Sequence, residues 1–390
     1  MSDPILDEVV LFVLGQTWTQ AADVSEVLET ARRIDGSDPE SWAREWQKTA
    51  ERLFAVGEAS DADGHRFSAS HAYLRAATYY RAALMRHMHP YSPEVAALTT
   101  REVEAFQRSL ALGDSSCKPV EIPYEQSSLP GFFCPAAHGD GPAPVIIFNV
   151  GRDVWAEDAK IIADEANKRG YHALLFDGPG QGKTLRLRGL PFRHDWEKVI
   201  TPVVDFALAQ RCVDAERIAL WGESMGGYLV PRAAAFEHRL ALIIANPGVL
   251  DWYRVFEANL TGFFPDALDL LGKDEAAFNA AIEKIMAESP FGRWGLEDTM
   301  WKHGVGTPAE LVHELEHYSL NGRETQITAR ALVVDAEKED RGQARELYDA
   351  LQTSKDYLLF TASEAAQFHD QPGARAISTQ RIFDWIDDAW

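Results

Sequence analysis

The stretch RIALWGESMGG, residues 217–227, combines a short apolar strand, the pattern G-x-S-x-G and the start of a helix. A strand that passes through such a turn into a helix is the context of a nucleophile elbow, with Ser224 at its apex in a strained conformation. Glycine is expected at 222 and 226 because a Cβ at either point would collide with the neighbouring strand or helix. The pattern alone is common, but the strand before it and a histidine further along make Ser224 a candidate nucleophile.

Short apolar runs on both sides of this stretch indicate buried strands. They cover residues 145–150, 172–176, 218–221, 240–245, 331–335 and 357–360. Helical stretches such as 156–168 and 198–209 lie between them, and a helix from 374 to 390 ends the chain. Buried strands that alternate with helices predict an α/β fold with a mostly parallel sheet covered on both faces. Residues 118–125, interrupted by prolines, are expected to form an edge strand.

The pattern of predicted elements changes near residue 115, from helices alone to strands that alternate with helices. Residues 1–115 are predicted to form an N-terminal helical domain, and residues 116–390 an α/β domain. Between about 250 and 327 the alternation stops, and a helical segment rich in aromatic residues is inserted before the last strands. Such an insert is placed to cover the strand ends, where ligands bind in open α/β sheets. We therefore expect it to act as a lid.

A serine nucleophile needs a base, and the base needs an orienting carboxylate. His369 lies in the loop between the last predicted strand and the last helix, which is the expected place of the base when the order is Ser, acid, His. The acid should follow the strand that ends at Val334, and the candidates are Asp335, Glu337, Glu339 and Asp340. In the usual turn a glycine stands where Ala336 is found, and this spacing points to Glu339. Asp340 is the second choice.

Tetrahedral chemistry also needs donors for a developing oxyanion. One is the backbone N–H of Met225, and the other is expected in the loop after the strand at 145–148. There Gly151 allows close approach of the backbone, and Arg152 or its neighbours supply the N–H. The nearby segment DGPGQGKT, residues 177–184, ends like a phosphate loop. It has Asp177 where that motif requires glycine, so we predict no nucleotide site.

The composition limits the class of partner. The formal net charge is −22, with 60 acidic and 38 basic residues, which argues against nucleic acid or an anionic membrane as partner. Three scattered cysteines indicate neither a disulfide framework nor a zinc site. The apolar run at residues 9–14 is too short for a signal or a membrane span. We expect a cytoplasmic protein without a metal site.

Several segments resemble one branch of the α/β-hydrolases. They are residues 177–182 (DGPGQG), residues 222–227 (GESMGG) and the loop from FTASE at 360–364 to His369. The branch contains 2,6-dihydroxypseudooxynicotine hydrolase and the fungal yellowish-green pigment hydrolases. Residues 73–82 (YLRAATYYRA) are similar to the N-terminal helical domain of that group, so the likeness covers most of the chain.

The resemblance implies an α/β-hydrolase fold and a homodimer that cleaves a carbon–carbon bond beside a carbonyl, or an ester, in a small molecule and without a cofactor. It implies Ser224 as nucleophile, Glu339 as acid and His369 as base. It also points to Asp153, because an acidic residue at the matching place of the nicotine-degrading relative is thought to act on the substrate. An extra acid suits carbon–carbon cleavage, in which a carbanion-like leaving group is protonated. Residues 154–155 (VW) depart from the branch, which often has small hydroxyl residues there.

The substrate that these features predict is an apolar aromatic or polyketide-like molecule, enclosed by the helical domain and the aromatic insert. Two alternatives remain open. The same three residues could transfer or cyclise an acyl group, or the chain could be a binding protein that retains a hydrolase fold without activity. Reactivity of Ser224 toward a fluorophosphonate distinguishes the second alternative from an enzyme.

Overall fold

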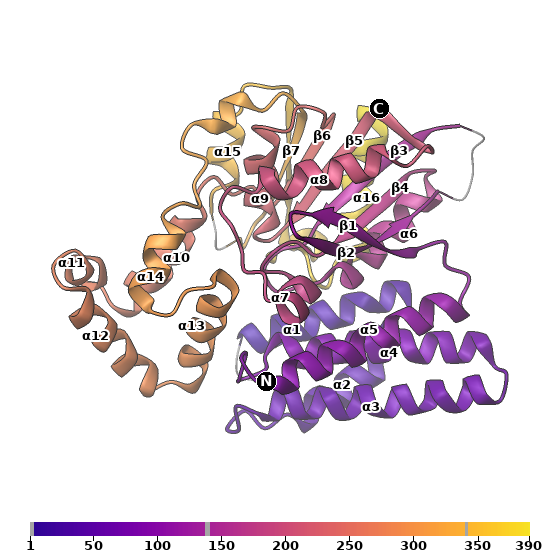
Figure 1. Cartoon of the computed structure of the whole chain (residues 1–390), viewed down its shortest axis with the longest axis horizontal. Helices are drawn as coiled ribbons and strands as arrows, with labels where there is room; N and C mark the ends of the chain where they lie inside the picture. The colour runs from indigo at the N-terminus through magenta and orange to yellow at the C-terminus, as the bar shows by residue number, and fades with distance from the viewer. Residues whose placement is uncertain (1–3, 137–140, 340–341) are drawn as a thin grey trace.

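The computed structural model describes residues 4–136, 141–339 and 342–390, and this part of the chain contains one sheet of eight strands (Figure 1). The order of the strands across the sheet is β1-β2-β4-β3-β5-β6-β7-β8. The strands are β1 (Lys118–Tyr124), β2 (Ser127–Cys134), β3 (Ala143–Asn149), β4 (His172–Phe176), β5 (Val213–Glu223), β6 (Leu242–Asn246), β7 (Arg330–Ala336) and β8 (Lys355–Phe360). β3 to β8 are parallel, and β1 and β2 form an antiparallel hairpin at one edge. The predicted α/β class is confirmed.

One strand, β2, is not predicted by the sequence pattern. Its sequence, SSLPGFFC, contains a proline and a glycine side by side, and both weigh against a strand in the interior of a sheet. The glycine fits because β4 approaches closely: a Cβ on Gly131 would lie 2.3 Å from the carbonyl oxygen of Leu175. Pro130 uses its carbonyl oxygen to accept a hydrogen bond from the N–H of Asp177 (3.0 Å).

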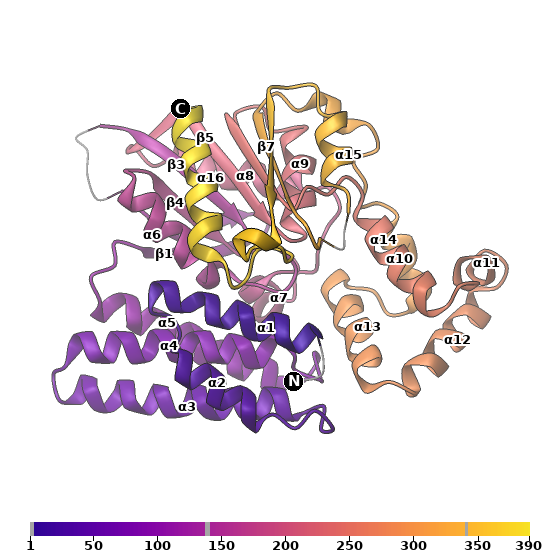
Figure 2. The same cartoon turned by 180° about the vertical axis from the view of Figure 1, so that it is seen from behind.

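Helices cover both faces of the sheet. On one face lie α6 (Lys160–Lys168) and α16 (Arg375–Ala389), and on the other α8 (Glu197–Leu208), α9 (Gly226–Ala234) and α15 (Ala344–Ala350), as Figures 1 and 2 show. Side chains of β3 alternate between the two cores: Ile146 and Phe148 pack toward the first face, and Ile147 packs toward the second. The continuous apolar runs in the sequence are therefore strands that are buried on both faces.

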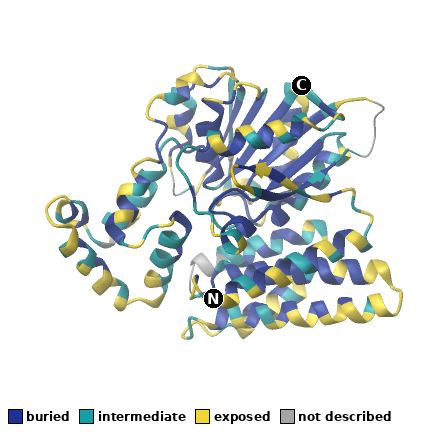
Figure 3. Cartoon of the chain, viewed as in Figure 1, coloured by how far each residue is buried: buried dark blue, intermediate teal, exposed yellow. Residues whose placement is uncertain are grey.

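Five helices precede the sheet: α1 (Pro4–Gly15), α2 (Val24–Arg33), α3 (Ser41–Ala62), α4 (Arg66–Met85) and α5 (Pro93–Leu112). Local signals start two of them, since Asp23 accepts from the N–H of Ser25 (3.0 Å) and Ser92 accepts from the N–H of Glu94 (3.2 Å). α4 lies between α3 and α5, and α3 presents an exposed outer face (Figure 3). The layer lies beneath the carboxyl ends of the parallel strands (Figure 1).

A second group of helices is inserted between β6 and β7: α10 (Trp252–Phe263), α11 (Ala267–Leu271), α12 (Glu275–Ala287), α13 (Pro290–His303) and α14 (Pro308–Leu315). It projects from the sheet beside the N-terminal helices (Figure 1). Some of its aromatic and aliphatic side chains form a small core of their own, with Phe278 and Ile282 buried against Val312. The insert is thus partly self-supporting, and its helical character is as predicted.

A cluster of buried charges joins the N-terminal helices to the sheet. Arg81 on α4 donates to Asp158 (2.7 Å) in the short helix η2 (Ala156–Ala159) and pairs with Glu102 on α5. Nearby, Lys183 on α7 (Gly182–Arg188) pairs with Glu157 of η2. The Arg81 and Glu102 side chains are 2% and 0% exposed. Burial raises the pKa of Glu102 well above its usual range. Charges this deep are stable only while each keeps its partner.

A disulfide links Cys117 to Cys134, with an S–S distance of 1.97 Å, and Cys212 is free. The scattered cysteines gave no indication of it. The antiparallel register explains the pair: Lys118 lies opposite Phe133, so the next position outward on each strand meets the other. Disulfides are typical of oxidising compartments, and the predicted cytoplasmic location remains untested. Among the described residues no helix has the length and apolar character needed to cross a membrane.

Replacing Arg81 by leucine is expected to lower the free energy of unfolding by about 3–5 kcal/mol, because two buried carboxylates lose their partner. The matched control is Arg32→Leu, since Arg32 pairs with Glu29 on the surface, where a pair contributes about 0–1 kcal/mol. Denaturation by guanidinium chloride measures both. Equal midpoints for the two variants would contradict the importance of the buried pair.

The disulfide predicts the count of reactive thiols. Denatured protein should show a single thiol, that of Cys212, without reductant, and all three cysteines after reduction. The double variant Cys117→Ser, Cys134→Ser should unfold with a free energy about 2–4 kcal/mol lower, because the open loop has more freedom in the unfolded chain. Three thiols without reductant would show that the bond is absent from the protein in solution.

Candidate active site

Ser224 occupies the sharp turn between β5 and α9, with φ of 57° in the left-handed region. Its N–H donates to the carbonyl oxygen of Asn246 at the end of β6 (2.7 Å). The glycines on either side are required by close approach. A Cβ on Gly222 would lie 2.2 Å from the carbonyl oxygen of Gly226, and a Cβ on Gly226 would lie 2.6 Å from that of Asn149. This is the geometry of a nucleophile elbow.

Ser224, His369 and Glu339 form one hydrogen-bonded chain. The Oγ atom of Ser224 lies 3.0 Å from Nε2 of His369, and Nδ1 of His369 lies 2.8 Å from Oε2 of Glu339. The imidazole is mostly covered and the Glu339 side chain is 1% exposed. The three residues come from the ends of β5, β8 and β7, so the parallel sheet brings together groups that are far apart in the sequence. A base within reach of a serine, and an acid behind the base, can activate the hydroxyl.

The other candidate acids that the structure describes have different partners. Asp335 accepts from its neighbour's N–H (2.8 Å) and from the hydroxyl of Tyr357. Glu337 accepts from the N–H of Ala362 (2.6 Å). Asp340, the second choice from the sequence, lies outside the described residues. The turn forms without the usual glycine because the N–H of Glu339 donates to the carbonyl oxygen of Ala336 (2.9 Å).

The two predicted oxyanion segments meet at Ser224. A Cβ on Gly151 would lie 2.7 Å from Cβ of Ser224 and 3.3 Å from the backbone nitrogen of Met225. Only a glycine allows the loop to approach this closely. The loop is held from behind by Gln181, whose amide nitrogen donates to the carbonyl oxygens of Val150 (2.6 Å) and Gly151 (3.1 Å). Gln181 was not singled out from the sequence, although it belongs to the DGPGQG segment.

The DGPGQG segment leads into a helix, and the carboxylate of Asp177 lies at the start of that helix. Asp177 accepts from the N–H of Lys183 (3.1 Å) at the start of α7 and from the N–H of Ala156 (2.8 Å). Burial raises the pKa of Asp177 to about 6, and the nearby Glu157 adds to the shift. The segment therefore supports the oxyanion loop on one side and η2 on the other.

Arg152 and Asp153 follow the oxyanion glycine and reach the lid. Arg152 donates to the hydroxyl of Thr299 on α13 (2.7 Å). Asp153 lies between the guanidinium of Arg152 (3.3 Å) and the ammonium of Lys302 (2.5 Å), and Lys302 also pairs with Asp298 (2.7 Å). Burial would raise the pKa of Asp153, but the two cations hold it below its usual range. Asp153 is therefore a carboxylate, and Lys302 is a site residue that the sequence pattern did not reveal.

Helix α13 also contacts the connection between α4 and α5. The ring of Trp301 lies 6.2 Å from that of Tyr91, and the guanidinium of Arg86 stacks over the ring of Trp294 at 4.9 Å. Next to Lys302, the imidazole of His303 is buried and stacked on Phe192 (5.3 Å). Burial, together with the cations at 152 and 302, lowers the pKa of His303 to about 3, so this histidine is neutral. Helix α13, which belongs to the insert, thus contacts both the N-terminal region and the α/β domain.

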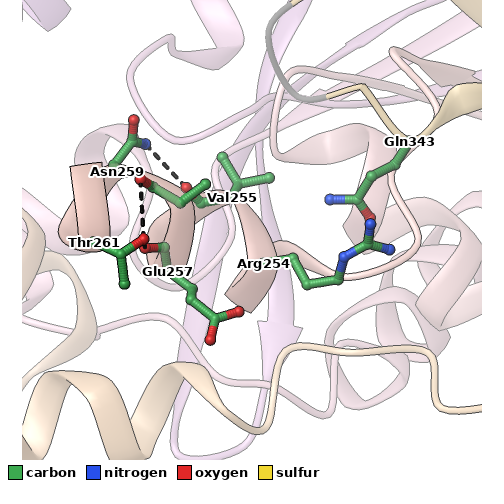
Figure 4. Close-up of a pocket in the computed structure, with 7 residues that line it drawn as sticks. Arg254, Val255, Glu257, Asn259, Thr261 and Gln343 are labelled. Carbon is green, nitrogen blue, oxygen red and sulfur yellow. Dashed lines mark hydrogen bonds between the residues drawn. The ribbon is translucent and has the colours of Figure 1, made fainter. Parts of the chain in front are cut away.

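A cavity of about 480 Å³ lies beside α10, and Figure 4 shows Gln343 facing this helix across it. Its lining is mostly polar and includes Arg254 and Glu257. Neither Ser224 nor His369 is among the residues that line it, so this cavity does not adjoin the serine. Gln343 serves the fold instead, since it accepts from the N–H of Asp251 (2.8 Å) and fixes the start of α10.

Comparisons with known proteins agree with this geometry. A model described as "Alpha/beta hydrolase family" matches residues 129–375. The chain is 33% identical to 20-hydroxy-prefusarin hydrolase of Gibberella moniliformis, over 97% of this chain and 95% of that protein. It is 30% identical to a hydrolase of a Fusarium species, with the same coverage. The crystal structure of 2,6-dihydroxy-pseudo-oxynicotine hydrolase superposes with a TM-score of 0.73 and 19% identity, covering 96% of this chain and 95% of that one.

Gln181→Leu should slow the reaction of Ser224 with a fluorophosphonate by about 10–100-fold, because the oxyanion loop loses the side chain that fixes its position. Gln210→Leu is the matched control, since its side-chain amide donates to the carbonyl oxygen of Phe206 in α8 (3.2 Å). Labelling rates followed by mass spectrometry test this. Equal rates in both variants would show that the loop is held without Gln181.

Proposed function

Because the chain belongs to the alpha/beta hydrolase family, we propose that it is a cofactor-independent serine hydrolase. The reaction is cleavage of a carbon–carbon bond beside a carbonyl, or of an ester, through an acyl-enzyme. The observation that carries this proposal is the hydrogen-bonded chain of Ser224, His369 and Glu339 at the elbow. A serine, a base and an acid in this order suit nucleophilic attack on a carbonyl carbon.

In the proposed mechanism the Oγ atom of Ser224 attacks the carbonyl carbon while Nε2 of His369 takes the hydroxyl proton. Glu339 accepts the hydrogen bond from Nδ1 and stabilises the imidazolium that forms. The oxyanion is held by the N–H of Met225 and by backbone N–H groups after Gly151. When the intermediate collapses, the bond to the leaving group breaks and the imidazolium protonates that group. Water then attacks the acyl-enzyme with the same base.

Carbon–carbon cleavage differs from ester cleavage in where the proton goes. The leaving carbon carries the electron pair of the broken bond, so a donor must reach that carbon. Asp153 is ill suited as this donor because its carboxylate is held ionised between two cations. We assign the proton to His369. Asp153 then serves to hold the ammonium of Lys302, and the lid with it, beside the oxyanion loop.

The substrate class is inferred from aromatic side chains of the inserted helices and from a relative. Trp252, Tyr253 and Phe256, at the start of the lid, are half-buried and pack against the core. Aromatic side chains of this kind are suited to contact an aromatic or polyketide-like molecule. One relative is named for hydrolysis of 20-hydroxy-prefusarin. We propose that the substrate of this chain is likewise an apolar small molecule with a reactive carbonyl. We also propose that the protein acts as a homodimer.

Ser224→Ala should reduce turnover by about 10⁴-fold or more, since the residue that forms the covalent bond is removed. A β-diketone and a simple aryl ester, assayed side by side, show which bond is cleaved. The matched control is Ser363→Ala, because Ser363 is exposed in the loop before His369. Full activity of Ser224→Ala would contradict the mechanism.

Two further measurements address the alternatives. Asp153→Asn should impair carbon–carbon and ester cleavage together if Asp153 only supports the lid, whereas a loss confined to carbon–carbon cleavage would make it a proton donor. Product analysis with an added alcohol or amine detects acyl transfer. No labelling of Ser224 by a fluorophosphonate in folded protein would favour a binding protein.

A further inference from the structure

A third carboxylate, that of Asp370, lies at the serine and the base. Its Oδ1 atom accepts from the N–H of Ser224 at 3.0 Å. Its Oδ2 atom lies 3.2 Å from Nε2 of His369, the same nitrogen that lies 3.0 Å from Oγ of Ser224. One carboxylate thus touches both the nucleophile's backbone and the catalytic nitrogen of the base. An imidazolium proton on Nε2 has two acceptors, the serine oxygen and Asp370.

The backbone places this carboxylate there at a conformational cost. Asp370 and Gln371 have φ of 56° and 47°, in the left-handed region that residues other than glycine rarely adopt. The conformation is fixed by Gln371, which is buried and accepts a hydrogen bond from the side chain of Asn246 (2.9 Å). The carbonyl oxygen of Asn246 accepts the same Ser224 N–H that reaches Asp370. Strain that is retained beside reacting groups is typical of functional positions.

We propose that Asp370 is a positioning residue of this site, whose carboxylate holds the imidazolium of His369 from the Nε2 side while Glu339 holds it from the Nδ1 side. The inference rests on the proposed role of His369 as the base. It adds a second acid to the expected set of three residues. The two carboxylates favour the imidazolium form of His369, so the neutral imidazole that accepts the proton of Ser224 becomes available only at higher pH.

The charges around His369 support this assignment. Glu339 approaches from the loop after β7, and Asp370 lies on the loop of His369 itself. Glu223, at the end of β5, is buried and paired with Arg375 of α16 (3.0 Å). Burial lowers the pKa of His369, but Asp370 first and Glu339 second outweigh it and raise the pKa to about 10. The two carboxylates therefore favour the protonated form of His369.

The sign of the pH effect follows. The neutral imidazole is the active base, so the reactivity of Ser224 should rise with pH until His369 has lost its proton. Asp370→Asn removes a negative charge and lowers the pKa of His369. Each unit by which it falls increases the neutral fraction at pH 7 about tenfold. The variant should therefore react at least tenfold faster than the wild type at pH 7. Above the pKa of the wild type this advantage disappears.

The experiment measures the midpoint of His369 directly and the reactivity of Ser224 independently. Protein labelled with ¹³C at the histidine ring is titrated by NMR, with His369→Gln to assign the signal, and the rate of fluorophosphonate labelling is recorded from pH 6 to 10.5. Asp370→Asn preserves an oxygen for the Ser224 N–H, and asparagine tolerates positive φ. Asp370→Gly, which also tolerates it, is the second variant. Asp388→Asn, exposed on α16, is the control for loss of charge.

We expect the His369 midpoint to fall by at least one pH unit in both Asp370 variants and to stay unchanged in Asp388→Asn. An unchanged midpoint in folded Asp370→Asn and Asp370→Gly would overturn the proposal. A Ser224 that is labelled at no pH, in a protein whose His369 midpoint still depends on Asp370, would overturn the proposed function and leave the carboxylate contact in place.

Discussion

The buried guanidinium of Arg81 is the constraint on which the arrangement of the molecule depends. It is the point where an N-terminal helix, a second helix and the segment after the oxyanion loop are held together by charge. Desolvated ions of this kind contribute little net stability, but they penalise every arrangement in which a partner is missing. The helical layer is therefore fixed in one position against the carboxyl ends of the strands.

A second set of charges fixes the lid. Lys302 is 2% exposed and lies between Asp153 and Asp298, so one ammonium links the oxyanion loop to α13. The same helix contacts the N-terminal layer through Trp301 and Tyr91. Helix α13 is consequently linked by direct contacts both to the oxyanion loop and to the N-terminal region. Without the Lys302 pair, Asp153 would lose its nearer cation, so the electrostatics of the oxyanion loop depend on the position of α13.

The order of strands and helices could be predicted because buried parallel strands and helix caps leave local patterns, and the elbow could be predicted because close approach demands glycine at fixed places. Ser224 and His369 were identified by their position relative to strands. Glu339 is one of four crowded carboxylates, and among the three of them that the structure describes it is the one within 2.8 Å of Nδ1 of His369. Gln181, Lys302 and Asp370 leave no such pattern, because each also contacts a residue far away in the sequence, namely Val150, Asp153 and Ser224. The pairing of Cys117 with Cys134 depended on β2, a strand hidden by its proline and glycine.

The loop that carries His369 also contacts the first of the N-terminal helices. Gly15, the last residue of α1, is so close to the loop after His369 that a Cβ there would lie 2.1 Å from the carbonyl oxygen of Pro372. The first helix of the chain thus supports the backbone that carries the base. A helical layer reshaped to accept a different substrate would shift that support, so selection for new specificity cannot act on this layer without also acting on the proton transfer. Divergence within such a scaffold should therefore be concentrated in the inserted helices, which have a small core of their own.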